Sequence, residues 1–260
     1  AVLTWPEGNG WIVRRIEEKL QAQIRTGALV FGIRNEGKGV CVDVYSAREN
    51  ASYRIRAERA VYACPRVFAR RLIAEEASAA LFLQEFQYAP WLVANLTLKS
   101  LPAENRGMPP AWDNVIYESP SLGYVVATHQ SLASRIRETV FTYYYAMAAS
   151  PPEEERARLV RTPWREWAEF IVRDLSRPHP EIRDLISRLD IFRWGHAMVR
   201  PRVGFIWGGA RKRAARAEGN ILFAHSDLSG FSLFEEAQYR GVLAAERILT
   251  EFRVPFSSSL

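Results

Sequence analysis

The sequence predicts an α+β fold, a mixed α/β chain in which helices cover an antiparallel or mixed sheet. Three observations support this class. Near the N-terminus, apolar residues at helical spacing are followed by short segments rich in β-branched and aromatic residues. The central part contains aromatic-rich strand candidates, and the last part contains an apolar strand, a turn and a long helix. The chain has 260 residues and 48% hydrophobic content, which is enough to bury a core.

The first part of the chain combines one helix with several short strands. Ile12, Ile16, Leu20 and Ile24 recur at helical spacing, so we expect a helix over residues 11–25. β-branched and aromatic residues then predict strands at 28–33, 40–45, 53–57 and 60–64. Pro65 suits the first turn of a helix that continues to Ile73.

The central part predicts an antiparallel sheet with an apolar, aromatic face. Strands are expected at 91–98, 115–117, 124–128 and 139–147. A charged amphipathic helix over 153–175, which Pro163 would kink, and a short helix over 181–189 should cover it. A strand over 191–201 leads to a loop and a helix around 211–217.

The last part reads as a buried strand, a turn and a helix. Ser232 and Glu235 have capping-box spacing, so the helix should begin at about Leu233 and run to Leu249. Ala237, Gly241 and Ala244 share one face, which would let the helix lie close to a sheet. The start of such a helix favours negative charge, although an ordinary packing unit would show the same pattern.

The same segment carries a family resemblance. Asp227-Leu228-Ser229-Gly230-Phe231-Ser232, followed by Glu235-Glu236-Ala237, resembles the C-terminal flavin-contacting motif of the FAD-dependent amine oxidase and phytoene desaturase superfamily. The order of the earlier elements is also similar, and the resemblance covers roughly the second half of those proteins. It implies a Rossmann-like FAD/NAD(P)-binding domain and FAD as cofactor. The implied FAD contacts are Val30, Ala63, Pro65, Asp227, Gly230, Phe231 and Ser232.

The resemblance also implies a domain organisation. Residues 1–75 and 204–260 would belong to the FAD-binding domain, and residues 76–203 would form the substrate-binding domain. Its aromatic residues would line a pocket for a small hydrophobic or amine substrate, although core packing explains any single aromatic equally well. The pocket candidates are Trp91, Tyr124, Tyr143, Trp194 and His196.

One expected motif is missing. The GxGxxG turn that binds the FAD pyrophosphate does not occur: Gly8-x-Gly10 follows no strand, and Gly37-x-Gly39 lies in a predicted hairpin. We therefore expect the N-terminal dinucleotide-binding half to lie on sequence outside this chain, and the chain alone to bind FAD poorly.

Composition and spacing exclude several other classes. The net charge is +6, but basic residues are scattered apart from Arg211-Lys212-Arg213, so no nucleic-acid partner is expected. Two cysteines and four histidines lack metal-ligand spacing, and no GxSxG elbow supports a hydrolytic triad at His225, Ser226 and Asp227. No apolar run is long enough for a transmembrane segment.

Two functional hypotheses lead from the sequence, with a nucleic-acid binder as a distant third. The first is the substrate-binding and flavin-contacting portion of an FAD-dependent oxidoreductase that removes hydride from a C–N or C–C bond; no catalytic residue is assigned. Lys99 is the one candidate for a lysine near the flavin, and its surroundings give no support. The alternative is a non-catalytic interaction module of the same fold that has lost the cofactor.

Overall fold

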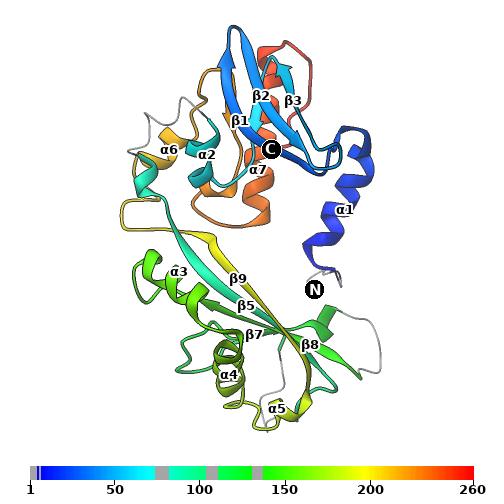
Figure 1. The fold of residues 1–260 in the computed structure, drawn as a ribbon, viewed down its shortest axis with the longest axis vertical. Helices are drawn as coiled ribbons and strands as arrows, with labels where there is room; N and C mark the ends of the chain where they lie inside the picture. Colours follow the sequence, from blue (N-terminus) through cyan, green and yellow to red (C-terminus); the bar gives the residue numbers. More distant parts are fainter. Residues whose placement is uncertain (1–4, 6, 74–81, 104–110, 131–136) are drawn as a thin grey trace. The chain divides into compact units, whose positions relative to one another are not determined.

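The computed structural model describes residues 5, 7–73, 82–103, 111–130 and 137–260. The chain divides into two compact units (Figure 1). Unit 1 contains residues up to Ile16 together with Tyr88–Ala197, and unit 2 contains Glu17–Gln87 and Met198–Leu260. Helices and sheets occur in the same chain, so the α+β prediction is confirmed. The binding roles predicted for the domains remain predictions.

Unit 1 is built on a five-stranded sheet in the order β6-β7-β8-β5-β9. Its strands are β5 (Gln87–Leu98), β6 (Asp113–Asn114), β7 (Tyr124–Val126), β8 (Thr139–Ala146) and β9 (Ile186–Arg200). The pairs β6–β7, β7–β8 and β8–β5 are antiparallel, as predicted. The strand expected at 115–117 is wrong. Asn114 closes a local turn with Ala111, and Val115 and Tyr117 are 80% and 83% exposed, so no packing supports their β propensity.

Two helices cover one face of this sheet (Figure 1). Alternate residues of β5 and β8, including Leu92, Leu96 and Phe141, are buried in one cluster with residues of α3 (Pro152–Arg161) and α4 (Trp164–Leu175). The single kinked helix predicted over 153–175 is wrong. Proline has no N–H to donate and disfavours helical geometry at the preceding residue, and Thr162 before Pro163 is extended.

The short helix predicted over 181–189 is helical only in its first half. α5 covers only Ile182–Leu185, and β9 starts at Ile186. Lys99 N–H donates to the Leu185 carbonyl and the Ser187 hydroxyl to the Thr97 carbonyl, so contact with the end of β5 replaces the helical bonds. A 3₁₀ turn, η4 (Ala127–Gln130), follows β7.

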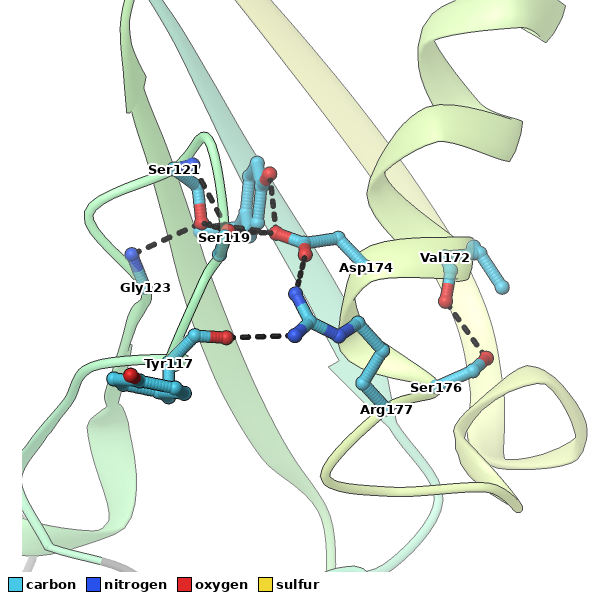
Figure 2. A network of polar contacts seen from close by, with 9 residues as sticks. Tyr117, Ser119, Ser121, Gly123, Val172, Asp174, Ser176 and Arg177 are labelled. Carbon is cyan, nitrogen blue, oxygen red and sulfur yellow. Dashed lines mark hydrogen bonds and ion pairs between the residues drawn. The ribbon is translucent and has the colours of Figure 1, made fainter.

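A buried polar network ties α4 to the loop before β7 (Figure 2). Asp174, near the end of α4, accepts hydrogen bonds at Oδ2 from the hydroxyls of Ser119 (2.6 Å), Ser121 (2.9 Å) and Tyr143 (2.9 Å). Arg177 Nη1 lies 3.6 Å from Oδ1 and its Nη2 donates to the Tyr117 carbonyl. One carboxylate thus joins a helix, a strand and a loop.

Unit 2 contains two small sheets. β1 (Ala28–Glu36), β2 (Gly39–Ser46) and β3 (Ala51–Ala57) form an antiparallel meander, while β4 (Ala60–Tyr62) pairs in parallel with β10 (Ile221–Phe223). Unit 2 also contains the helices α2 (Arg66–Leu72) and α6 (Ala210–Ala214) and the 3₁₀ turns η3 (Phe82–Glu85) and η5 (Ser226–Leu228). α2 begins after Pro65 as predicted, and α6 is shorter than the predicted 211–217.

The two terminal helices differ in how they pack. α1 (Asn9–Leu20), followed by η1 (Gln21–Gln23), has no buried residue. α7 (Phe234–Glu251) begins one residue after the predicted start, and Ala244 packs on Leu222 and Ala224 of the β10 segment. Within the described part of the chain, no helix combines the length and apolar content needed to cross a bilayer.

The predicted capping box is wrong. Leu233 occupies the N-cap position of α7, and no side chain bonds to the helix start. Ser232 Oγ instead accepts a hydrogen bond of 3.1 Å from the backbone N–H of Val199. A tertiary partner has replaced the local one.

Candidate functional site

The turn between β10 and α7 holds most of the predicted cofactor residues. Asp227 is only 2% exposed, and its Oδ2 accepts a 3.0 Å hydrogen bond from Arg66 N–H, directly after Pro65. Its Oδ1 lies 3.1 Å from His225 Nδ1. The structure therefore brings Pro65 and Asp227 together, and one carboxylate oxygen already accepts a hydrogen bond from the chain itself.

Gly230 is covered by its own chain. Its φ is +82°, and a Cβ there would lie 2.7 Å from Ile206 Cδ1, so the position requires glycine. Its N–H donates to the carbonyls of Ser226 and Asp227. Gly230 thus closes a turn packed against the 205–206 loop, and its backbone is not open to a ligand.

Three arginines that sequence reasoning missed hold this turn. Arg211 donates to the carbonyls of Phe205, Ile206, Leu228 (3.3 Å) and Ser229 (2.7 Å), joining the loop to the turn. Arg240 of α7 donates to Ser229 Oγ and the Leu228 carbonyl, and burial lowers the pKa of its guanidinium, with nearby Arg211 adding to the effect. Buried Arg66 lies 3.6 Å over the Phe223 ring and donates to the Ala214 carbonyl. Their partners are distant backbone carbonyls, which no sequence pattern reveals.

The start of α7 is more accessible. Phe231 and Leu233 are 50% and 56% exposed, and no side chain caps the first amides of the helix. Apolar side chains beside unpartnered helix amides suit a planar ring that gains negative charge. Glu235 and Glu236 in the first turn oppose such a charge, so the fit to a flavin depends on the backbone amides.

The other predicted cofactor residues lie outside this turn. Val30 is half-buried at an irregularity of β1, in a different sheet from β10. Ala63 is exposed between β4 and α2, two residues before Pro65. Their contacts with a cofactor remain predictions.

Unit 1 presents a second candidate surface, the sheet face opposite α3 and α4. We call it the open face and define it by Trp91, Asn95, Thr142 and Tyr144, which alternate with the buried residues of β5 and β8. Trp91 stacks on Tyr144 with 6.4 Å between ring centroids and an interplanar angle of 12°. Thr142 Oγ1 donates to Asn95 Oδ1.

Asp113 adds a negative charge at one edge of the open face. Its register partner Val125 pairs in turn with Thr142, so Asp113, Val125 and Thr142 lie in one cross-strand row. The Tyr144 hydroxyl donates a hydrogen bond to the Asp113 carboxylate. Burial raises the pKa of Tyr144 to about 12, and the Asp113 bond contributes.

β9 extends the open face. Ile191 packs on the core, and a Cβ at Gly195 would point toward Arg156 of α3, 3.8 Å away. Phe192 and Trp194 alternate with these residues and therefore point away from the helices, whereas the His196 ring packs on buried Tyr88 with 6.1 Å between ring centroids. Phe192 and Trp194 are 43% and 55% exposed.

The structure separates the five predicted pocket residues. Trp91 and Trp194 belong to the open face, and His196 packs on buried Tyr88. Tyr124 and Tyr143 are buried beneath the helices, where the Tyr124 hydroxyl bonds His179 Nε2 and Tyr143 bonds Asp174. A ligand on the open face cannot reach them, and the five do not form a single pocket.

Metal binding finds no support in the described residues, among which no group of three His, Cys, Asp or Glu side chains could hold an ion. Cys41 and Cys64 are both free thiols.

Comparison with known proteins identifies the fold. No protein-family model and no curated protein sequence matches the chain. Among solved structures, cyclohexylamine oxidase from Brevibacterium oxydans IH-35A aligns with a TM-score of 0.71 and 14% identity, over 95% of this chain and 53% of the oxidase. The chain has the fold of half an oxidase. A triple mutant of putrescine oxidase with redesigned cofactor binding gives a TM-score of 0.69 and 14% identity, over 94% and 53% of the two chains.

A putative protoporphyrinogen oxidase from Exiguobacterium sp. 255-15 aligns similarly, with a TM-score of 0.68 and 13% identity over 95% of this chain and 52% of its own. The chain thus spans about half the length of the oxidases it matches. The fold implied by the sequence resemblance is confirmed, and identities of 13–14% carry the likeness no further than the fold.

Proposed function

We propose that this chain is the substrate-binding and cofactor-contacting portion of an FAD-dependent oxidoreductase that removes hydride from a C–N or C–C bond of a small hydrophobic or amine substrate. The observation that carries the proposal is the strand–turn–helix of β10 and α7, whose accessible helix start is bordered by Phe231 and Leu233 within an oxidase-like fold.

FAD, when bound, would supply the ring that accepts the hydride. The first amides of α7 would stabilise the negative charge that the ring gains on reduction, and Phe231 would contact it. Asp227 would act as a positioning residue, because it joins Arg66 N–H at the start of α2 to the turn. Gly230 and Ser232 would stabilise the conformation of the turn through their contacts with Ile206 and Val199.

The open face would bind the substrate. Trp91, Tyr144 and Trp194 offer apolar ring surface, and Asp113 offers an acceptor for an amine. Aromatic faces also attract organic cations, so the same surface suits a protonated amine or an uncharged apolar group.

A dinucleotide-binding half would complete the FAD site. Unit 2 carries apolar side chains that its own residues leave exposed: Leu20 and Ile24 at 43% each, and Leu29 and Phe31 of β1 at 64% and 52%. Soluble domains rarely leave such groups uncovered. Their exposure supports a covering segment outside this chain, which spans 53% of the matched oxidases.

The test uses the chain expressed together with the coding sequence that precedes it in its gene. We expect purified protein with flavin absorbance and, at FAD concentrations near 100 times Kd, a gain of about 2.7 kcal/mol in the free energy of unfolding. Leu233→Glu should weaken FAD binding by placing charge at the start of α7, whereas Thr250→Glu at the other end should not. Protein without flavin absorbance or FAD-dependent stabilisation would select the non-catalytic interaction module instead.

A further inference from the structure

A polar hollow lies in unit 2 where the turn between β2 and β3 meets the segment leading into β1. It has a volume of about 500 Å³, within the size range of small-molecule sites. Neither the proposed flavin contacts nor the open face includes it. The polar side chains that line it are Arg25, Thr26, Ser46, Arg48, Glu49 and Tyr53.

Hydrogen bonds fix the walls of this hollow. The Ala47 N–H donates to the Gly27 carbonyl at 2.9 Å, which attaches the turn to the start of β1. The Glu49 N–H donates to Ser46 Oγ at 3.2 Å, and the turn is closed by a 2.6 Å bond from the Tyr45 hydroxyl to Asn50 Oδ1. These bonds fix the backbone of the turn that carries Ser46, Arg48 and Glu49.

The charge of the lining is positive and not neutralised locally. Arg25 and Arg48 come from different segments, and neither forms an ion pair with another residue that the structure describes. Glu49 is the one acidic residue among the lining side chains, so the wall carries a net positive charge. Both arginines are exposed, so a bound anion can reach their guanidinium groups.

The donor set selects the type of anion. Guanidinium groups bind phosphate oxygens with paired, charge-assisted hydrogen bonds, and the Thr26, Ser46 and Tyr53 hydroxyls add further polar contacts. The volume leaves room for an organic group beside the phosphate. We propose that this hollow binds the phosphate group of a phosphorylated small molecule, with Arg25 and Arg48 as its main ligands. Ile24 also lines the hollow, and the proposed function places Ile24 under a covering segment, so the binding test uses the chain without that segment.

Isothermal titration of the chain with inorganic phosphate, AMP and adenosine tests it. We expect both phosphate compounds to bind and adenosine not to bind. Arg25→Gln and Arg48→Gln should each weaken AMP binding roughly tenfold or more. Arg202→Gln removes an exposed arginine of the same unit and should leave binding unchanged. Circular dichroism melts would confirm that all three variants fold.

Three results would overturn the proposal. The first is no binding of either phosphate compound, and the second is adenosine binding as tight as AMP binding. The third is an equal loss of affinity in Arg202→Gln, which would indicate a general charge effect. If inorganic phosphate binds as tightly as AMP, the phosphate site is supported and the organic group contributes nothing to affinity.

Discussion

Replacing Asp174 tests the polar network that joins α4 to the sheet of unit 1. The carboxylate is 6% exposed and accepts three hydroxyl hydrogen bonds on one oxygen (Figure 2). Asp174→Ala would leave the Tyr143 hydroxyl, on a side chain that is 0% exposed, without its acceptor. Ser119 and Ser121 lose less, because their hydroxyls lie 2.7 Å apart and can bond to each other.

The expected cost follows from these contacts. An unsatisfied buried hydroxyl costs ~1–3 kcal/mol, and charge-assisted bonds contribute more than neutral ones. The contact with Arg177 adds little, because that side chain is 44% exposed and the ion pair is screened. We therefore expect Asp174→Ala to lower the free energy of unfolding by about 2–5 kcal/mol.

Urea unfolding of a double-mutant cycle measures this cost. Tyr143→Phe should cost ~1 kcal/mol in the unmodified protein, but nothing in the Asp174→Ala background, where it removes an unsatisfied hydroxyl. Asp184→Ala, at an exposed acidic residue of α5, should change stability by less than about 0.5 kcal/mol. The reasoning fails if Asp174→Ala costs under ~1 kcal/mol, or if Tyr143→Phe costs the same in both backgrounds.

Three further predictions concern stability. Burial lowers the pKa of His179 in the folded protein, so as pH falls the unfolded chain binds a proton at this histidine more readily than the folded chain does. The free energy of unfolding should therefore fall as pH drops below about 6.5. His179→Gln should flatten this dependence in urea midpoints measured from about pH 7.5 to 5. Gly230→Ala should lower the free energy of unfolding by about 1–3 kcal/mol, because Gly230 has a positive φ and a Cβ there would contact Ile206. Gly241→Ala in α7, with open space around it, should instead stabilise the protein by ~0.5–1 kcal/mol. Equal shifts in melting temperature would contradict the turn geometry at Gly230. Ser232→Ala should lower the free energy of unfolding by ~1–2 kcal/mol, because Val199 N–H loses its acceptor. Glu235→Ala should cost less in the same melts. Equal losses in the two variants would indicate that Ser232 and Glu235 form a capping box after all.

β-branched and aromatic residues made most of the sheets predictable. Residues 139–147 and 91–98 are rich in them, and the structure buries every second residue of these segments against α3 and α4. Proline also sets helix boundaries, because it has no backbone N–H to donate. α2 starts after Pro65, and α3 and α4 are separated at Pro163. Local rules sufficed wherever the deciding contact was local.

Tertiary contacts decided the features that the sequence did not reveal. The Ser232 and Glu235 spacing fits a capping box, but the hydroxyl bonds Val199, 33 positions earlier. Asp227 has the residue type expected of a ligand for a cofactor hydroxyl, yet its oxygens contact Arg66 and His225. In both cases a distant backbone N–H competes for the same oxygen, and only the fold brings it near.

The consecutive tyrosines of β8 show how much the same alternation could have added to the site. Tyr143, Tyr144 and Tyr145 must point to alternate faces of a strand. Tyr143 and Tyr145 are 0% and 5% exposed in the core, so Tyr144 must lie on the open face, where it stacks on Trp91 and bonds Asp113. Trp91 pairs with Ala146 and Tyr143 pairs with Ala94, and these two pairs lie on opposite faces of the sheet, so Trp91 and Tyr143 do not line one pocket. The covered face takes the tyrosine whose hydroxyl finds a buried acceptor in Asp174, and the open face keeps the one whose ring and hydroxyl remain within reach of a ligand.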